Sequence, residues 1–245
     1  MASKQHALRV SNKPVRPRYY RTKGSVWQRI KPILVLVVGA WILTLAVLRI
    51  VAPPLTSLVA IRQIQSIWSE YPGFESWEWV ALRNLPMHVK QVVVTAEDAR
   101  FMDHYGVDLL AVGDVLDSAG SKRRLRGAST ITMQTVKNIF LWPGRSYVRK
   151  GLEWLMAPVA GLIWGKKRTL ELYLNVIEWG PGIYGIDSAA RFYFKKPAAY
   201  LTLHEAASLA AILPNPRKLS PLRMVYSTRS RYQRIMREYS ATRVP

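Results

Sequence analysis

The distribution of apolar residues divides the chain into one long uncharged run and a series of shorter helical patterns. From Ile33 to Leu48 no residue is charged, and Ile50, Val51 and Ala52 continue the apolar stretch past Arg49. This length is close to the lower limit for a membrane-spanning helix, and an arginine at its end can extend its charge toward the headgroups. We therefore expect a single transmembrane helix over residues 32–52.

After this run, apolar residues recur at the three- and four-residue spacing of amphipathic helices, with glycine, proline and basic clusters between the segments. We find no convincing pair of strands. The pattern predicts a mainly α domain over residues 53–245, without repeats. The predicted helices are Met87–Thr95, Val107–Ser118, Thr130–Phe140, Tyr147–Ile163, Thr169–Trp179, Tyr184–Phe194 and Leu203–Leu213.

The segment Leu55–Trp68 also has apolar residues at helical spacing, directly after Pro53-Pro54. One interpretation is an amphipathic helix that packs on the domain. The other is a helix in the membrane interface, because Trp68, Trp77 and Trp79 follow and tryptophan favours that zone. The sequence leaves both interpretations open.

The charge of the chain points to an anionic partner. The net charge is +21 over 245 residues, and 49% hydrophobic residues are enough for a sizeable core. Residues 1–31 carry nine Lys and Arg and no acid. Beside an apolar run, this distribution predicts a cytoplasmic N-terminal arm and an extracytoplasmic remainder. A cleavable signal peptide is less favoured, because the arm is long and no clear small-x-small site precedes Pro53.

The residues from Ala96 to Asn138 hold the densest candidate chemistry. Two adjacent acids, Glu97 and Asp98, follow an apolar run, and apolar neighbours suit an acid to accept a proton. A row of hydroxyls and amides then leads to Lys137. Neutral donors beside a fixed positive charge suit a polyhydroxylated, anionic ligand, although Ser and Thr before an apolar run are also common helix caps.

These segments resemble the signatures of the family 51 glycosyltransferases, the peptidoglycan polymerases. The first signature is matched by Glu97-Asp98-x-x-Phe101-x-x-His104-x-Gly106, and the second by Gly127-x-Ser129-Thr130-Ile131-Thr132-x-Gln134-x-x-Lys137-Asn138. The family pattern has two successive glutamines where this chain has Met133 and Gln134, which leaves the role of the first amide open.

Three later signatures follow in the family order, so the resemblance runs from Glu97 to Pro221. The third is Arg149-Lys150-x-x-Glu153, the fourth contains Lys167-x-x-Leu170-Glu171-x-Tyr173-Leu174-Asn175, and the fifth contains Leu203-x-Glu205-Ala206-Ala207 and Pro214-x-Pro216. The resemblance implies a lysozyme-like helical domain. We expect the monofunctional form, because no transpeptidase domain follows.

The resemblance implies an inverting enzyme that transfers a growing lipid-diphosphate-linked glycan chain onto lipid II. Glu97 and Glu153 are then the catalytic residues. The expected substrate-binding residues are Ser129, Thr130, Gln134, Lys137, Arg145, Arg149 and Lys150. No cofactor is required by the sequence, and a divalent cation, Mg²⁺ or Mn²⁺, at the diphosphate is an alternative known in relatives.

The resemblance also sets the expected partners and place. The partners are lipid II, the nascent glycan strand, the membrane and, as an option, cell-division or elongation proteins. The expected localisation is the cytoplasmic (inner) membrane. We expect no nucleic acid partner, since only the N-terminal arm suits one.

Two other functions share parts of this pattern. A glycan-cleaving lysozyme-like enzyme would share fold and glutamate, but it has no diphosphate for Lys137 and Arg145 to neutralise. An inactive cell-wall scaffold would not need Glu97 and Glu153.

Several local patterns carry less weight. The four histidines lack metal-ligand spacing, so we expect no metal site in the protein itself. The segment Gly180–Gly185 matches GxGxxG, but a helical pattern precedes it where a dinucleotide site needs a strand. The run Lys122–Arg126 is either a solvated surface or a mobile basic loop beside the catalytic acid.

Overall fold

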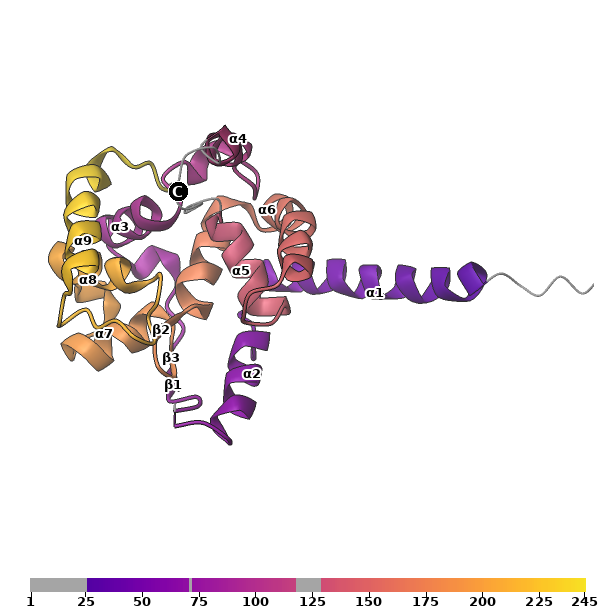
Figure 1. The fold of residues 1–245 in the computed structure, drawn as a ribbon, viewed down its shortest axis with the longest axis horizontal. Coiled ribbons are helices and arrows are strands. Elements are labelled where there is room, and N and C mark those ends of the chain that lie inside the picture. Colours follow the sequence, from indigo (N-terminus) through magenta and orange to yellow (C-terminus); the bar gives the residue numbers. More distant parts are fainter. Residues whose placement is uncertain (1–25, 71, 118–128) are drawn as a thin grey trace, which may run out of the picture. The chain divides into compact units, whose positions relative to one another are not determined.

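The computed structural model describes residues 26–70, 72–117 and 129–245. It contains two compact units, Met1–Trp41 and Ile42–Pro245. The basic run Lys122–Arg126 and most of the N-terminal arm lie outside the described residues. The second unit is mainly helical, as the sequence predicted (Figure 1).

Helix α1 spans Val26–Leu48 and is long and apolar enough to cross a membrane. It begins before the predicted residues 32–52, with Pro32 inside it. The last turn of this helix belongs to the second unit, where Leu45 and Leu48 are buried. The Trp164 indole donates a hydrogen bond to the Leu45 carbonyl at 3.0 Å. These residues are therefore part of the folded domain.

The predicted helices form close to their expected bounds. They are α2 (Ser57–Ser66), α3 (Met87–Glu97), α4 (Leu109–Asp117), α5 (Ile131–Phe140), α6 (Tyr147–Val176), α7 (Ile186–Phe194) and α8 (Leu203–Ile212). Helix α6 joins two predicted helices across a break at Gly165, whose φ of 67° is not helical. Short 3₁₀ turns η1 (Leu82–Asn84), η2 (Phe101–Asp103), η4 (Ala198–Tyr200) and η5 (Tyr239–Ala241) lie between or after the helices.

The core of the domain is built from α3, α5, α6 and α8. Val92, Val93 and Val94 of α3 are fully buried, and α8 is buried around most of its circumference because alanine occupies four of its ten positions. A helix that is apolar on all sides belongs inside a domain. A capping box between Thr202 and Glu205 fixes where α8 begins. In Figure 1, α5 and α6 lie side by side within this core.

Two elements were not predicted. A small sheet joins β1 (Ser76–Trp77), β3 (Ile183–Tyr184) and β2 (Glu178–Gly180) in that order, parallel between β1 and β3 and antiparallel between β3 and β2. The expectation of no strand pair was therefore wrong. Strands of two or three residues are too short to show an alternation of apolar and polar residues. Gly182, with a φ of 74°, forms the turn between β2 and β3. Helix α9 (Tyr226–Glu238) was also missed.

The sheet also explains the GxGxxG match. A strand does precede the glycines, but β2 returns antiparallel through β3 before α7 begins. A dinucleotide site needs a parallel βαβ unit at this point. The GxGxxG match is therefore accidental. The reason is the antiparallel return of the chain through β3, and not the helix that the sequence pattern predicted before the glycines.

Candidate active site

The carboxylate of Glu97 lies at the last residue of α3 and contacts two other helices. Its Oε2 accepts a hydrogen bond from Gln134 Nε2 of α5 at 2.7 Å. Its Oε1 forms an ion pair with Arg231 of α9 at 2.5 Å. A carboxylate offers about four lone-pair positions, so each oxygen keeps room for another donor. Glu97 is therefore held in place and can still accept a proton.

The buried Tyr173 of α6 sets the direction of the Gln134 amide. Its hydroxyl donates to Gln134 Oε1 at 3.4 Å, so the amide nitrogen faces Glu97. Burial raises the pKa of the Tyr173 hydroxyl well above its usual value, which keeps it a donor. The chain Tyr173, Gln134 and Glu97 thus links the second and fourth signatures to the first.

Asp98, next to Glu97, holds two segments of the fold together through its hydrogen bonds. Its carboxylate contacts His104 Nε2 at 2.9 and 3.2 Å and accepts from the backbone N–H of Ile131 at 3.0 Å. The last bond ties the loop after α3 to the first turn of α5. This contact gives His104 a structural role within the first signature.

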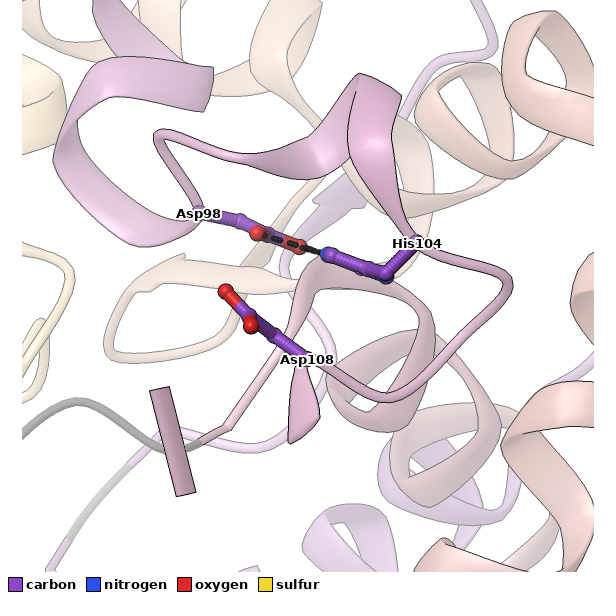
Figure 2. A group of neighbouring side chains, drawn as sticks. All are labelled: Asp98, His104 and Asp108. Carbon is purple, nitrogen blue, oxygen red and sulfur yellow. Dashed lines mark hydrogen bonds and ion pairs between the residues drawn. The ribbon is translucent and has the colours of Figure 1, made fainter. Parts of the chain in front are cut away.

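Asp98, His104 and Asp108 are the group among the described residues whose side chains could together hold a metal ion (Figure 2). Their bonds argue against it. Figure 2 shows Asp98 and His104 joined to each other, and Asp108 accepts from Arg100 Nε at 2.8 Å and from the Ala111 N–H at 2.9 Å. A divalent cation would have to displace a guanidinium and an imidazole proton. These residues do not fit Mg²⁺ or Mn²⁺.

The close packing of the first signature requires Gly106. Its φ is 97°, and a Cβ there would lie 2.4 Å from the Ala157 carbonyl oxygen of α6. The Thr130 hydroxyl donates to the Gly106 carbonyl at 2.5 Å and accepts from the Met133 N–H as the cap of α5. Thr130 was predicted to bind substrate, and its hydroxyl keeps one acceptor position beyond these two bonds.

Glu153 lies in a second ionic cluster on α6. Its side chain is 3% exposed and pairs with Arg149 and, at 3.0 Å, with Lys150. The Lys150 ammonium also donates to the Ser129 hydroxyl at 2.6 Å. Burial, with the positive charges of Arg149 and Lys137, lowers the pKa of Lys150 to about 8. The three signature residues of α6 and Ser129 are thus brought together.

Two cavities meet at Gln134. The first has a volume of about 1190 Å³ and contains Glu97, Ser129, Thr130 and Arg145 in its wall. The second has a volume of about 280 Å³ and contains Lys137 and Arg149. Gln134, Pro214 and Asn215 line both. The structure therefore divides six of the seven predicted substrate-binding residues between two adjacent spaces, and Lys150 lines neither.

Lys137 has an unusual position in this arrangement. Among the described residues, its ammonium has no hydrogen-bond acceptor and no acid within ion-pairing distance, although Glu97 and Glu178 both act on it electrostatically. Burial and the charge of Arg149 lower its pKa. A half-buried cation without such a partner is suited to an anionic ligand.

Met133, which replaces the usual glutamine, is fully buried in α5. Its side chain packs in the core and lines neither cavity. The residue that contacts Glu97 is the next one, Gln134.

Sequence reasoning missed Arg231 and the residues Arg62, Glu178 and Arg217 around the second cavity. Arg231 lies outside the motifs that carried the resemblance. The basic spacing of Arg231, Arg234 and Arg237 along one helix was the available signal, and all three line the first cavity.

Comparisons with known proteins identify the family of the chain. A family model described as Transglycosylase matches residues 65–240. Relatives named "Biosynthetic peptidoglycan transglycosylase" occur in Shewanella frigidimarina (49% identity; 71% of this chain, 73% of the relative), Marinomonas sp. (42%; 81% and 84%) and Pectobacterium carotovorum (41%; 81% and 84%). The matched region contains Glu97, Glu153 and every residue of both cavities except Leu58 and Arg62. On this evidence the chain belongs to the transglycosylase family of peptidoglycan synthesis.

Proposed function

We propose that the protein is a peptidoglycan glycosyltransferase that polymerises lipid II. The observation that carries this proposal is the placement of Glu97 in a large cavity beside fixed cations. The first cavity contains Glu97 together with Arg145, Arg231, Arg234 and Arg237. A carboxylate for a sugar hydroxyl and cations for a diphosphate are what this transfer requires.

In the proposed reaction, the 4-hydroxyl oxygen of the lipid II acceptor attacks the anomeric carbon of the donor chain. Glu97 takes the hydroxyl proton while the bond from that carbon to the diphosphate breaks. A positioned base contributes about 10²–10⁴-fold to such a step. Attack from the side opposite the leaving group inverts the anomeric carbon and gives a β-1,4 bond.

The departing diphosphate gathers negative charge, and fixed cations stabilise it more in the transition state than before. We assign this role to Lys137, Arg145 and Lys150. Glu153 lies beneath Arg149 and Lys150 and orients them rather than accepting the proton. Ser129 and Gln134 supply neutral contacts to sugar or diphosphate oxygens.

The proposed divalent cation, Mg²⁺ or Mn²⁺, would bind the substrate diphosphate itself. The carboxylates of Asp98 and Asp108 are taken by protein donors, so we assign no protein ligands to this ion. When bound, it would add positive charge at the diphosphate. We expect chelation to reduce the rate less than loss of Lys137.

Helix α1 suggests membrane anchoring. We further propose that the anchor lies in the cytoplasmic membrane with the basic arm inside and residues 53–245 outside, on the distribution of positive charge. Cell-division or elongation proteins as partners rest on the family resemblance alone.

The proposal is tested with the purified full chain in detergent and labelled lipid II. We expect a polymer that lysozyme digests, and no polymer from Glu97→Gln. Release of fragments from preformed glycan, with no polymer from lipid II, would identify a cleaving enzyme instead. Binding of glycan without either product would identify a scaffold.

A further inference from the structure

The guanidinium of Arg231 bonds to two consecutive residues at the end of α3. Its Nη2 donates to the Ala96 carbonyl at 2.8 Å and to Glu97 Oε1 at 2.5 Å. The last four carbonyls of a helix have no partner within it, and a cation at that end interacts favourably with the helix dipole. One side chain of α9 therefore caps α3 and also holds the carboxylate of its last residue.

Further contacts fix the C-terminal segment on the same part of α3. Ile235, one turn after Arg231, is fully buried, and after η5 the Thr242 hydroxyl bonds to the Thr95 hydroxyl at 2.7 Å. The Gln91 amide of α3 donates to the Thr242 carbonyl at 3.4 Å. Burial lowers the pKa of the Arg231 guanidinium while the carboxylate beside it opposes that shift, and arginine stays protonated at neutral pH. The segment thus brings a fixed positive charge to the end of α3.

The two carboxylate oxygens of Glu97 have different donors. Oε1 accepts from the charged guanidinium of Arg231, whereas Oε2 accepts from the neutral amide of Gln134 at 2.7 Å. A bond from a charged donor is about twice as strong as one from a neutral donor, and it favours the ionised carboxylate. Oε2 is therefore the oxygen that accepts a proton more easily. All three side chains line the first cavity, so a hydroxyl group bound there has access to Oε2.

Other ionisable groups act on this ion pair through their charges. They are Lys137 of α5, Tyr173 of α6 and Arg234 of α9. The adjacent Asp98 carboxylate is paired with His104. Arg231 differs from Lys137 and Arg234 in bonding directly to the Glu97 carboxylate. We therefore expect its loss to affect the ionisation of that carboxylate more than the loss of either of them.

We propose that Arg231 is a positioning residue that keeps Glu97 ionised and directs the proton of the acceptor hydroxyl to Oε2. The proposal rests on the proposed function, in which Glu97 is the base. In that step the O–H bond breaks, its proton passes to Oε2, and its electron pair stays on the oxygen that forms the bond to the anomeric carbon. The bond from that carbon to the diphosphate breaks, and the diphosphate leaves with the electron pair. Arg231 stays bonded to Oε1, and the proton then passes to water, which returns Glu97 to its ionised form.

The test compares kcat/KM as a function of pH for the full chain in detergent with labelled lipid II. In Arg231→Gln the ionised carboxylate loses its charged partner, so the acidic limb of the profile should move to higher pH by about one pH unit. Its kcat at neutral pH should fall about tenfold or more, because the carboxylate is no longer held in one orientation. Arg231→Lys keeps the charge, and its acidic limb should stay close to that of the wild type. Arg229→Gln is the matched control, because Arg229 is an exposed residue of the same helix and lines neither cavity.

An acidic limb at the same pH in wild type and in folded Arg231→Gln would overturn the proposal and leave Arg231 a merely structural role. A raised KM for lipid II, with kcat and the acidic limb unchanged, would also overturn it, because Arg231 would then bind the substrate. Thermal melts show whether each variant is folded. If Arg231→Gln does not fold, Arg231→Met, which keeps an apolar stem without the charge, carries the same expectation.

A second measurement separates this proposal from the polymerase assignment. NMR of isotope-labelled glutamate carboxyl groups follows the ionisation of Glu97 without any turnover, and Glu97→Gln assigns its signal. If the wild type makes no polymer and the signal titrates at higher pH in Arg231→Gln, the polymerase is rejected and the action of Arg231 on the carboxylate is supported. If the wild type makes polymer and the signal titrates at the same pH in both proteins, the polymerase is supported and the role of Arg231 is rejected.

Discussion

Glu97 and Glu153 are both signature acids, and the structure gives them opposite surroundings. Glu97 ends a helix, lines the first cavity and contacts one neutral amide and one guanidinium. Glu153 lies inside a helix, is almost fully buried and is covered by two cations of its own helix. The difference supports the proposed roles, in which the accessible Glu97 exchanges a proton with the substrate and the enclosed Glu153 positions cations.

The strongest test of this comparison is Glu97→Gln. The amide keeps the size of the side chain but does not accept a proton at neutral pH, so kcat should fall by about 10²–10⁴-fold. The protein should still fold, because the amide oxygen can accept from Arg231, although the amide nitrogen cannot accept the bond that Gln134 donates to Glu97. Near-wild-type turnover in a continuous lipid II assay would show that the base lies elsewhere.

Lys137 provides a second test of the comparison, because its ammonium interacts electrostatically with both Glu97 and Arg149. Lys137→Ala removes a charge-assisted contact worth roughly 1.5–3 kcal/mol, which corresponds to a loss of about 10–150-fold in kcat/KM. The control is Lys218→Ala, whose lysine is exposed and lines neither cavity. Equal losses in the two variants would mean that lysines act through general attraction of the substrate.

Glu153→Gln should reduce kcat about tenfold, less than the change at Glu97, because a neutral amide can still accept from Arg149 or Lys150. Its clearer effect should be on stability. Removing one partner of a buried pair costs about 3–5 kcal/mol, and the retained amide oxygen should keep the loss near 2 kcal/mol. Chemical denaturation measures this loss. If Glu153→Gln lowers kcat more than Glu97→Gln does, in a protein of normal stability, then Glu153 is the base and Glu97 the positioning acid.

The smallest expected effect is a pH dependence from Lys150. Its pKa is lowered to about 8, so the positive charge beside Glu153 is present below that pH and is lost above it. We expect kcat/KM to decline a few-fold between pH 7.5 and 9. Lys150→Arg keeps the charge through this range because arginine stays protonated, and its profile should be flat there. An identical decline in both proteins would assign the titration to another group.

The sequence predicted the helical domain well because long amphipathic segments carry a strong periodic signal. It also predicted that Glu153, Arg149 and Lys150 share a helix face, which their three- and four-residue spacing requires. The two-residue strands carry no such signal. Helix α9 was missed because it is rich in arginine and has few apolar residues to mark a buried side.

The site was predicted less completely than the fold, for a physical reason. Motif spacing identifies residues within one segment, but the contacts that complete this site join distant segments. Arg231 contacts Glu97 from α9, and Glu178 contacts Arg62 and Arg217, which lie before and after it in the sequence. The sequence offered the cap as an alternative for the hydroxyls before α5, and Thr130 is that cap, but motif spacing did not indicate that Met133 would be buried.

The contact between Arg231 and Glu97 has a consequence for how the protein matures. The two residues are 134 positions apart, and Arg231 is made long after α3, α5 and most of the core. Synthesis proceeds from the N-terminus, and a domain folds as a unit once its elements are present. A nascent chain can therefore assemble the helices that carry both glutamates before it can hold Glu97 in its final orientation. On the proposed role of Glu97, we expect catalytic competence to arrive with the docking of α9.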